Sequence, residues 1–464
     1  MKYISTRGGI TPIEFKPAVM MGLADDGGLI VPETIPDVSA ELDSWRELPY
    51  VDLALEVMQP FVSDISGADL AGLISKSYKD AFPEDVVPLA KLGDFFVLEL
   101  YHGPTLAFKD VALQLLGNIF EHVLAETGEF LNVLAATSGD TGSAAIYGVR
   151  GRERIHIFVM HPHGRVSPIQ ERQMTTVLDE NVHNIAVEGT FDDAQKVLKE
   201  ISGDLEFKRE YRLGAVNSVN WARVLAQMVY YFSAAFGVQR ETNARGVRFC
   251  VPTGNFGDIL AGYYAKRMGA PIDSLVLATN ENDILSRFFN TGVYALGNVT
   301  RTLAPAMDIQ VASNFERYLF HKLGDDGARV EELMSGFAKT GSLELPVPEG
   351  QERFDSEISA AAATRADVVA AIAWAFEEHD YVIDPHTAVG VHVALNAPPA
   401  DVPTVCLSTA HPAKFPDAVR EATGREDIGR HESIDALDGL ETRCAVLPAE
   451  ASAVREFMKR TLAE

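Results

Sequence analysis

Residues 131–162 read LNVLAATSGDTGSAAIYGVRGRERIHIFVMHP and contain the clearest structural signal in the chain. The apolar run LNVLAAT (131–137) leads through SGDTG into the helical pattern SAAIYGVRG, and the apolar run IHIFVMHP (155–162) follows it. Strand-length apolar runs on either side of a helix are typical of a βαβ unit, in which the two strands lie parallel.

The same alternation continues along the chain. A helical pattern follows at SPIQERQMTTVL, and the further strand-like runs are VHNIAVEG (182–189), VRFCVPT (247–253), SLVLATN (274–280) and TVCLSTAHP (404–412). Strands that alternate with helices predict an α/β protein with mostly parallel sheets that helices flank on both faces. Because 464 residues exceed what one hydrophobic core normally supports, we expect two lobes.

The flanking segments differ from this pattern. Residues 1–92 are rich in proline and are expected to form an N-terminal domain, and the acidic residues 426–464 are expected to form a C-terminal peripheral segment. The catalytic or binding core is therefore predicted to span residues 93–425, as two α/β lobes.

The composition excludes several classes of function. The formal net charge is -26, so a general electrostatic field would repel nucleic acid and anionic membranes. Cys250, Cys406 and Cys444 have no close spacing and are interpreted as thiols in a reducing compartment, and no metal site is expected. The N-terminus lacks the apolar core of a signal peptide, and no run reaches the roughly 18 apolar residues of a membrane span. We expect a cytoplasmic protein.

Ligands of such sheets bind beyond the carboxyl ends of the strands, where loops meet helix N-termini. The first loop of this kind is SGDTG (138–142), in which the hydroxyls of Ser138 and Thr141 and the backbone amides can donate to a carboxylate. A simple turn with an N-cap would have the same sequence, so both interpretations remain open at this point.

The second loop is PTGNFGD (252–258), directly after an apolar run. Gly254 and Gly257 flank Asn255 and Phe256, so several backbone N–H groups can converge on one phosphate. The loop matches neither GxxxxGK[ST] nor GxGxxG, so it gives little support to nucleotide binding. The alternative is a plain connection from strand to helix.

The third loop is LSTAHPAKF (407–415), where Ser408 and Thr409 offer neutral hydroxyls at a strand end. His411 and Lys414 could equally belong to a solvated helix start.

A single lysine lies just ahead of a helical pattern. YHGPTLAFKD (101–110) delivers Lys109 just ahead of apolar residues at 111, 115, 119 and 123, which share one helix face. A lysine at a helix start is usually solvated. The coincidence of a lysine, a phosphate cradle, a carboxylate-type loop and a neutral hydroxyl instead indicates a pyridoxal phosphate site, in which the lysine forms an imine and the hydroxyl meets the pyridine nitrogen.

With these motifs in place, the sequence resembles the threonine synthases, a family of fold type II (β-family) pyridoxal phosphate enzymes. The resemblance covers nearly the whole chain, through the motifs YISTRGG, HGPTLAFKD, ATSGDTGSAA, NSVNWARVLAQMVYYF, PTGNFGDILAGYYAKRMG, APAMDIQVASNFER, DPHTAVG and STAHPAKF. It implies the conversion of O-phospho-L-homoserine and water into L-threonine and phosphate, by γ-elimination and β-addition of water.

The resemblance also implies roles for individual residues. Lys109 matches the Schiff-base lysine, and Thr409 matches the hydroxyl that faces the pyridine nitrogen. Asp140 stands where other fold type II enzymes often have an asparagine that meets the cofactor, so no direct contact is assigned to it. The cofactor phosphate loop corresponds to Gly254, Asn255, Phe256, Gly257 and Asp258.

The substrate's own phosphate requires a second anion site. Arginine can hold two phosphate oxygens at once, so the candidates lie around two arginines and their neighbouring hydroxyls and amides. They are Arg165 and Ser167 in HPHGRVSP, and Asn217, Ser218, Asn220 and Arg223 in AVNSVNWARV. Arg165 as a loop cation and Arg223 as a helix-surface residue remain alternatives.

Two other functions stay open at the sequence level. One is another fold type II activity, such as a threonine or serine dehydratase, although the long N-terminal segment and NSVNWARV speak against it. The other is a non-catalytic binding protein that retains the fold, against which the intact Lys109 argues. The sequence leaves the choice between a monomer and a homodimer open.

Overall fold

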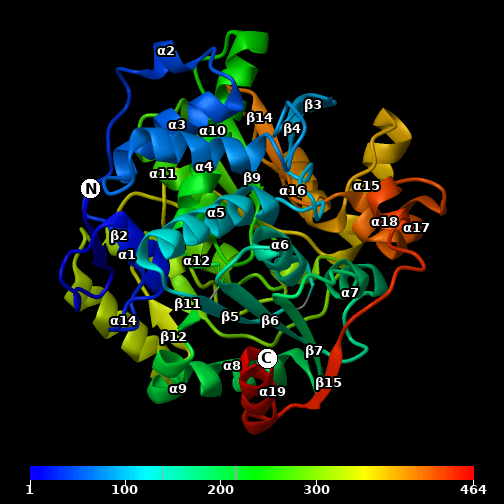
Figure 1. Cartoon of the computed structure of the whole chain (residues 1–464). Helices are drawn as coiled ribbons and strands as arrows, with labels where there is room; N and C mark the ends of the chain where they lie inside the picture. Colours follow the sequence, from blue (N-terminus) through cyan, green and yellow to red (C-terminus); the bar gives the residue numbers. More distant parts are fainter. Residues whose placement is uncertain (138, 215, 217, 464) are drawn as a thin grey trace.

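Two large sheets form the framework of the protein. The computed structural model describes residues 1–137, 139–214, 216 and 218–463 (Figure 1). The first sheet has the strand order β15-β7-β6-β5-β8, and every neighbouring pair in it is parallel. Its strands are β5 (Leu131–Ala136), β6 (Ile155–Pro162), β7 (Val182–Glu188), β8 (Leu213–Gly214) and β15 (Ala445–Pro448).

The second sheet has the order β13-β10-β9-β14-β4-β3. Its pairs are parallel except for the antiparallel edge pair of β3 with β4. Its strands are β3 (Leu89–Leu92), β4 (Phe95–Glu99), β9 (Val247–Pro252), β10 (Ile272–Thr279), β13 (Ile358–Ala362) and β14 (Thr404–Ser408). Two-stranded antiparallel ribbons pair β1 (Tyr3–Ser5) with β2 (Ile30–Pro32) and β11 (Val293–Ala295) with β12 (Ser342–Glu344).

Helices flank both sheets. In the N-terminal half they are α1 (Phe15–Met21), α2 (Leu42–Trp45), α3 (Tyr50–Met58), α4 (Gly67–Tyr78), α5 (Lys109–Thr127), α6 (Asp140–Val149), α7 (Pro168–Thr175), α8 (Phe191–Gly203), α9 (Leu205–Glu210) and α10 (Trp221–Thr242). The later ones are α11 (Gly257–Arg267), α12 (Ile284–Thr291), α13 (Phe315–Lys322), α14 (Gly327–Thr340), α15 (Arg365–His379), α16 (Pro385–Asn396), α17 (Pro416–Thr423), α18 (Glu432–Asp435) and α19 (Ala451–Ala463). Short 3-10 turns are η1 (Gln59–Phe61), η2 (Pro305–Met307) and η3 (Pro412–Lys414).

The mostly parallel α/β architecture expected from the sequence is confirmed. The apolar runs at 131–137, 155–162, 182–189, 247–253 and 404–412 correspond to β5, β6, β7, β9 and β14. Successive side chains of a strand point to opposite faces of the sheet, so each strand contributes side chains to the cores on both faces. In β9, for example, Phe249 and Val251 join the large central core, whereas Cys250 packs on the opposite face with α15 and α16.

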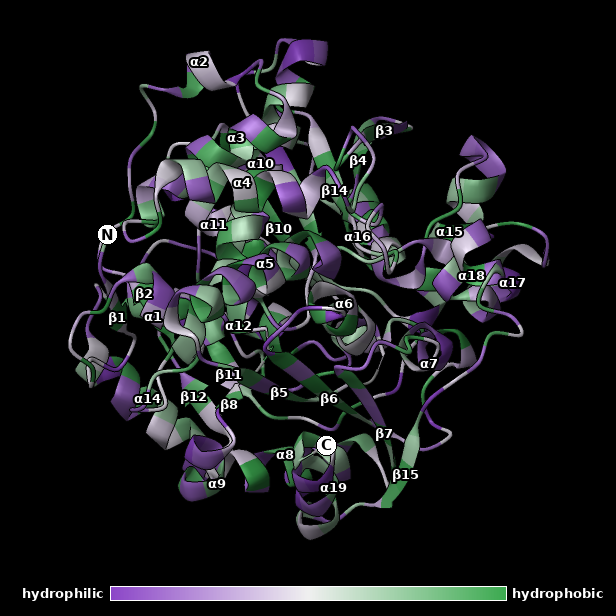
Figure 2. Ribbon diagram, in the orientation of Figure 1, coloured by the Kyte–Doolittle hydropathy of each residue, from purple (hydrophilic) through white to green (hydrophobic). Residues whose placement is uncertain are grey.

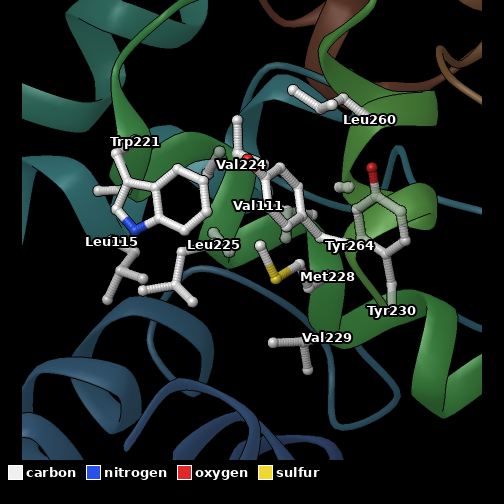
Figure 3. Close-up of a cluster of buried hydrophobic side chains, with 14 of the residues drawn as sticks. Val111, Leu115, Trp221, Val224, Leu225, Met228, Val229, Tyr230, Leu260 and Tyr264 are labelled. Atoms are coloured by element: carbon white, nitrogen blue, oxygen red, sulfur yellow. The ribbon is translucent and has the colours of Figure 1, made fainter. Parts of the chain in front are cut away.

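The centre of the molecule is α10, a helix that is buried on nearly all sides. Figure 3 shows part of the apolar cluster around it, in which Trp221 and Tyr230 of α10 lie among apolar side chains. The ring of Trp221 meets that of Tyr264 edge to face at 5.1 Å, and its indole N–H donates to the hydroxyl of Tyr3. Helix α10 is therefore anchored from both its own lobe and the N-terminal segment.

The C-terminal segment completes the first sheet. Strand β15 pairs with β7 at the sheet edge, and Val454 and Met458 of α19 pack against the face that also carries Phe158. Figure 2 shows apolar positions concentrated in the interior strands, whereas outer helices such as α9 carry hydrophilic residues. Among the described residues, no helix combines the length and apolarity needed to cross a membrane.

Candidate active site

A pocket lies where the carboxyl ends of β9 and β14 meet the starts of α5, α6 and α11. Its lining includes Lys109, Thr141, Ser218, Arg223 and Thr409, together with the whole of the loop 252–258. The three loops singled out in the sequence therefore converge on one cavity, as the rule for parallel sheets predicts.

The segment before α5 is held in one conformation by its own first turn. The carboxylate of Asp110 accepts hydrogen bonds from the backbone N–H of Thr105, at 2.8 Å, and from the Thr105 hydroxyl, at 2.7 Å. Asp110 is fully buried, and this burial raises its pKa to about 6 despite the two Thr105 donors. A Cβ at Gly103 would lie 2.5 Å from that of Asp110, so the turn needs glycine there. These contacts fix the backbone just before Lys109.

Lys109 is the first residue of α5 and is only 8% exposed, so it is not a solvated lysine. Its Nζ lies 3.8 Å from Oδ2 of Asp140 and 5.1 Å above the ring of Phe108. Burial lowers the pKa of Lys109 from its ordinary value, while the Asp140 carboxylate acts in the opposite direction. Such an environment favours a neutral amine, which is the form that acts as a nucleophile or base.

The loop 252–258 forms a narrow cradle. A Cβ at Gly254 would lie 2.7 Å from the carbonyl oxygen of Ala306, and Phe256 has a left-handed φ of 63°. Helix α11 begins at Gly257 without a side-chain cap, so its first N–H groups are free to serve a ligand at this end. The loop and the N-terminus of α11 can together bind a phosphate group.

A network of polar side chains supports the cradle from behind. The hydroxyl of Ser313 donates to Oδ1 of Asn255 at 3.0 Å, and the side-chain amide of Asn314 donates to the backbone carbonyls of Asn255 and Ser218. The hydroxyls of Ser218 and Ser313 are 2.7 Å apart. The Oδ1 of Asn255 is thus used in positioning the loop, and the backbone N–H groups of the loop can serve as ligand donors.

Asp258 points away from the cradle toward α10. Its Oδ1 accepts hydrogen bonds from the hydroxyls of Tyr230, at 2.5 Å, and Tyr231, at 3.0 Å. Its Oδ2 has no hydrogen-bond partner in the described part of the chain, and burial raises its pKa to about 6. Because it is partly protonated near pH 6, this carboxyl opposes a bound phosphate less there than a full charge would.

Arg223 is the main cation that faces the cradle from α10. It is 5% exposed, which excludes the helix-surface alternative, and burial lowers its pKa to about 10. Its Nε and Nη1 have no partner among the residues that the structure describes. Gln227 lies one helical turn further on and also lines the pocket. A buried guanidinium with unpaired donors costs free energy unless a ligand accepts its hydrogen bonds. Arg223 therefore indicates a binding site for an anion.

The loop after β14 contributes Thr409. Its backbone N–H donates to the hydroxyl of Thr387, which in turn lies 2.9 Å from that of Ser408 and donates to the carboxylate of Asp384. These hydrogen bonds join the end of β14 to the start of α16. Asp384 also accepts from His386, another residue of the pocket wall.

The chemistry of this donor set fits pyridoxal phosphate. A buried amine can bond an aldehyde carbon, a glycine cradle can bind phosphate oxygens, and a neutral hydroxyl can meet a ring nitrogen. The unpaired guanidinium of Arg223 is left for a second anion. The residues that would hold the group are Lys109, the loop 254–257 and Thr409.

Other predicted residues lie elsewhere. Arg165 is exposed on the loop between β6 and α7, and Ser167 is exposed and caps α7 by accepting from the backbone N–H of Gln170. Asn220 is fully buried, caps α10, and donates to the carbonyl of Val19. None of these three side chains is part of the pocket wall given by the described residues. Ser138 and Asn217 lie outside the described residues.

Sequence reasoning missed or misjudged three neighbours of the site. Gln227 and His386 line the pocket without having been assigned a role. Lys414, for which a solvated helix start was one interpretation, is 1% exposed and forms an ion pair with Asp140 at 2.9 Å. The spacing of Arg223 and Gln227 on one helix was a signal that could have located Gln227.

Family models cover most of the chain. Residues 2–78 match the model described as threonine synthase N terminus, residues 82–339 match pyridoxal-phosphate dependent enzyme, and residues 387–458 match threonine synthase, C-terminal.

Individual proteins agree with these models. The threonine synthase of Pseudomonas aeruginosa is 47% identical over 471 residues, which cover 99% of this chain and 98% of the relative. A crystal structure of pyridoxal-phosphate-bound threonine synthase from Brucella melitensis has a TM-score of 0.94 and 44% identity, and covers 99% of each chain. The threonine synthase structure from yeast has a TM-score of 0.93 and 41% identity, and covers 100% of this chain and 99% of its own.

Proposed function

Because the chain belongs to the threonine synthase family of pyridoxal-phosphate-dependent lyases, we propose that it converts O-phospho-L-homoserine and water into L-threonine and phosphate. This reaction is the final step of threonine biosynthesis. The observation that supports the proposal best is that an unpaired buried guanidinium, Arg223, shares a pocket with the buried amine of Lys109 and with a glycine cradle.

When bound, pyridoxal phosphate supplies an electron sink that stabilises negative charge on the substrate carbons next to the amine. Lys109 is proposed to attach the cofactor and then to move protons between substrate carbons. This task needs a neutral amine, which the burial of Lys109 favours. Thr409 would offer a neutral hydroxyl to the ring nitrogen, so that nitrogen would stay largely unprotonated.

The two ends of the substrate require different partners. Thr141 is proposed to donate to the substrate carboxylate, since it lines the pocket in the first turn of α6. Arg223, with Ser218 nearby in the wall, is proposed to bind the phosphate that leaves. This phosphate gains charge as its C–O bond breaks, and a bidentate guanidinium stabilises such a charge most where water is excluded.

Arg165 remains a second proposal for the phosphate. It is less well supported than Arg223, because it is exposed and lies outside the pocket wall. Its sequence neighbour Ser167 is engaged in capping α7.

The broader assignments are also proposals. We place the domain boundaries at residues 92 and 425. A cytoplasmic location is proposed from the reduced thiols of Cys250, Cys406 and Cys444, which form no disulfide in the described chain.

The direct test compares substrates on the purified holoenzyme. Phosphate release and threonine formation from O-phospho-L-homoserine should be fast, whereas formation of 2-oxo acid from threonine or serine should be slow. Efficient deamination of threonine or serine without phosphate release would contradict the proposal and favour a dehydratase.

A further inference from the structure

A second buried lysine lies beside Lys109 and has no role in the chemistry described so far. Lys414, in η3 after β14, has a side chain that is 0% exposed. Its ammonium donates to the backbone carbonyl of Thr105 at 2.7 Å and pairs with Oδ1 of Asp140 at 2.9 Å. A charged group is buried to this extent only when its partners repay the loss of hydration. Lys414 therefore ties the loop before α5 to the start of α6.

The two oxygens of Asp140 serve different partners. Oδ1 receives both Lys414 and the side-chain amide of Gln170, at 2.9 and 2.8 Å. Oδ2 lies 3.8 Å from Nζ of Lys109, beyond hydrogen-bond distance. The closer ion pair of Asp140 is thus with Lys414, although Lys109 is the reactive lysine of the proposed function.

The pKa shifts of Asp140 and Lys109 agree with this assignment of the two oxygens to different lysines. Burial alone would raise the pKa of Asp140, but the charges of Lys414 and Lys109 outweigh burial and hold it well below its ordinary value. The ionised form of Asp140 is therefore favoured, with Lys414 as the largest of the charges that stabilise it. Burial, followed by the charges of Lys414 and Arg223, lowers the pKa of Lys109, while Asp140 and Asp110 act against them.

The charged groups around this pair come from several elements. Asp140 is on α6, Lys414 is on η3, Arg223 is on α10, and Asp110 is on α5 itself. His386 of α16 also acts electrostatically on Asp140 and lowers its pKa.

We propose that Lys414 is a positioning residue that engages Asp140 and thereby keeps the nitrogen of Lys109 free of a close carboxylate partner. The inference deepens the proposed function, because it concerns the same site. Without the ammonium at 414, Asp140 would have Lys109 as its nearest buried cation. A close carboxylate partner and the loss of a neighbouring positive charge would each stabilise a proton on Lys109.

The test uses the holoenzyme without substrate. Its readout is the pH midpoint of the cofactor's visible absorption band, which reports the proton held at the Lys109 nitrogen. In Lys414→Met this midpoint should move upward by about one unit or more, which lowers the unprotonated fraction about tenfold at a pH below both midpoints. The acid limb of the pH profile of kcat should move in the same direction.

Three further variants separate charge from structure. Lys414→Gln retains a donor for the Thr105 carbonyl and should show the same upward shift. Gln170→Leu removes a neutral donor from the same Oδ1 and should shift the midpoint much less. The double variant Lys414→Met with Asp140→Asn removes both charges and should return the midpoint toward the wild-type value.

An unchanged midpoint in folded Lys414→Met or Lys414→Gln would overturn the proposal. An equal shift in Gln170→Leu, or a double variant that stays shifted, would also overturn it, because the effect would then be one of packing. Since no substrate is present in the titration, a failure of the substrate assignment would leave this result interpretable.

Discussion

The backbone N–H of Phe108 donates a 2.9 Å hydrogen bond to the carbonyl of Thr409. An antiparallel bridge between residues 107 and 410 lies beside it. The residue before Lys109 is thereby joined to the hydroxyl residue of the third loop through the main chain alone. A change of side chain at 409 should therefore alter the chemistry of the site without displacing the lysine.

Thr409→Val tests this separation. Valine keeps the shape of threonine but removes the hydroxyl that we assign to the ring nitrogen. We expect the cofactor to remain attached, with an unchanged visible band, whereas kcat should fall about tenfold because one neutral hydrogen bond is lost. Loss of the band in a folded variant would show that the hydroxyl serves cofactor binding instead.

The cradle should tolerate no side chain at position 254. In Gly254→Ala the new Cβ would lie 2.7 Å from the carbonyl oxygen of Ala306, and a backbone atom cannot move aside cheaply. Overpacking of this kind costs roughly 1–3 kcal/mol, so the affinity for pyridoxal phosphate should fall by about 5- to 150-fold in a fluorescence titration.

Gly72→Ala is the matched control for that change. Gly72 lies within α4, and a Cβ there would meet nothing within 4 Å. Its cofactor affinity should equal that of the wild type. Wild-type affinity in Gly254→Ala as well would mean that the loop 252–258 is not the phosphate cradle.

Arg223→Met should separate catalysis from stability. Loss of a charged partner for the leaving phosphate should reduce kcat/KM for O-phospho-L-homoserine by about 30- to 1000-fold. The free energy of unfolding should not fall, because the replaced guanidinium has two unpaired nitrogens. Inorganic phosphate should raise the Tm of the wild-type holoenzyme more than that of the variant.

Arg165→Ala is the comparison for Arg223, since Arg165 is exposed. Arg165→Ala should lower kcat/KM for O-phospho-L-homoserine much less than Arg223→Met does. If Arg223→Met loses the visible band of the cofactor while Arg165→Ala loses activity, the two arginines have been assigned to the wrong phosphates.

Asp258 should make the protein less stable as the pH rises. Its pKa in the folded state is about 6, above the ordinary value of 3.8, so the folded state binds the proton more tightly than the unfolded state does. The stabilisation is fully present below about pH 4 and is lost as the pH rises through 6, by about 3 kcal/mol in total. Urea unfolding at pH 5 and pH 7.5 should show a smaller loss in Asp258→Asn than in the wild type.

Asp110 is unchanged in both proteins, so its own raised pKa cancels in this comparison. An identical pH dependence of the two proteins would indicate that Asp258 is ionised throughout.

The parallel strands could be predicted from the sequence because both faces of each are buried. Strands β5, β6 and β7 therefore appear as continuous apolar runs with glycine or proline at their ends. The interior strand β4 and the short edge strands β3, β8, β13 and β15 were not predicted. They span at most five residues each, and their place depends on a neighbour that only the tertiary fold supplies.

The side chains around the pocket were harder to predict than the loops. Helix α10 is buried on nearly every side, so its sequence does not indicate that Arg223 faces the cavity. Lys414 follows a proline at a short helix start, which is also a pattern of solvated residues, and only the packing of η3 against α6 makes it a partner of Asp140. The capping roles of Ser167 and Asn220 could have been recognised, since serine and asparagine are preferred N-caps.

Lys109 is the lysine that we propose bears the cofactor, and a second buried lysine, Lys414, lies beside it as the alternative attachment site. The holoenzyme is reduced with borohydride, digested, and mapped by mass spectrometry for the pyridoxyl group. The label is predicted on the peptide that contains Lys109 and should be absent from Lys109→Ala. A label on Lys414, which shares the Asp140 carboxylate with Lys109, or on any other lysine would rule out Lys109 as the attachment site.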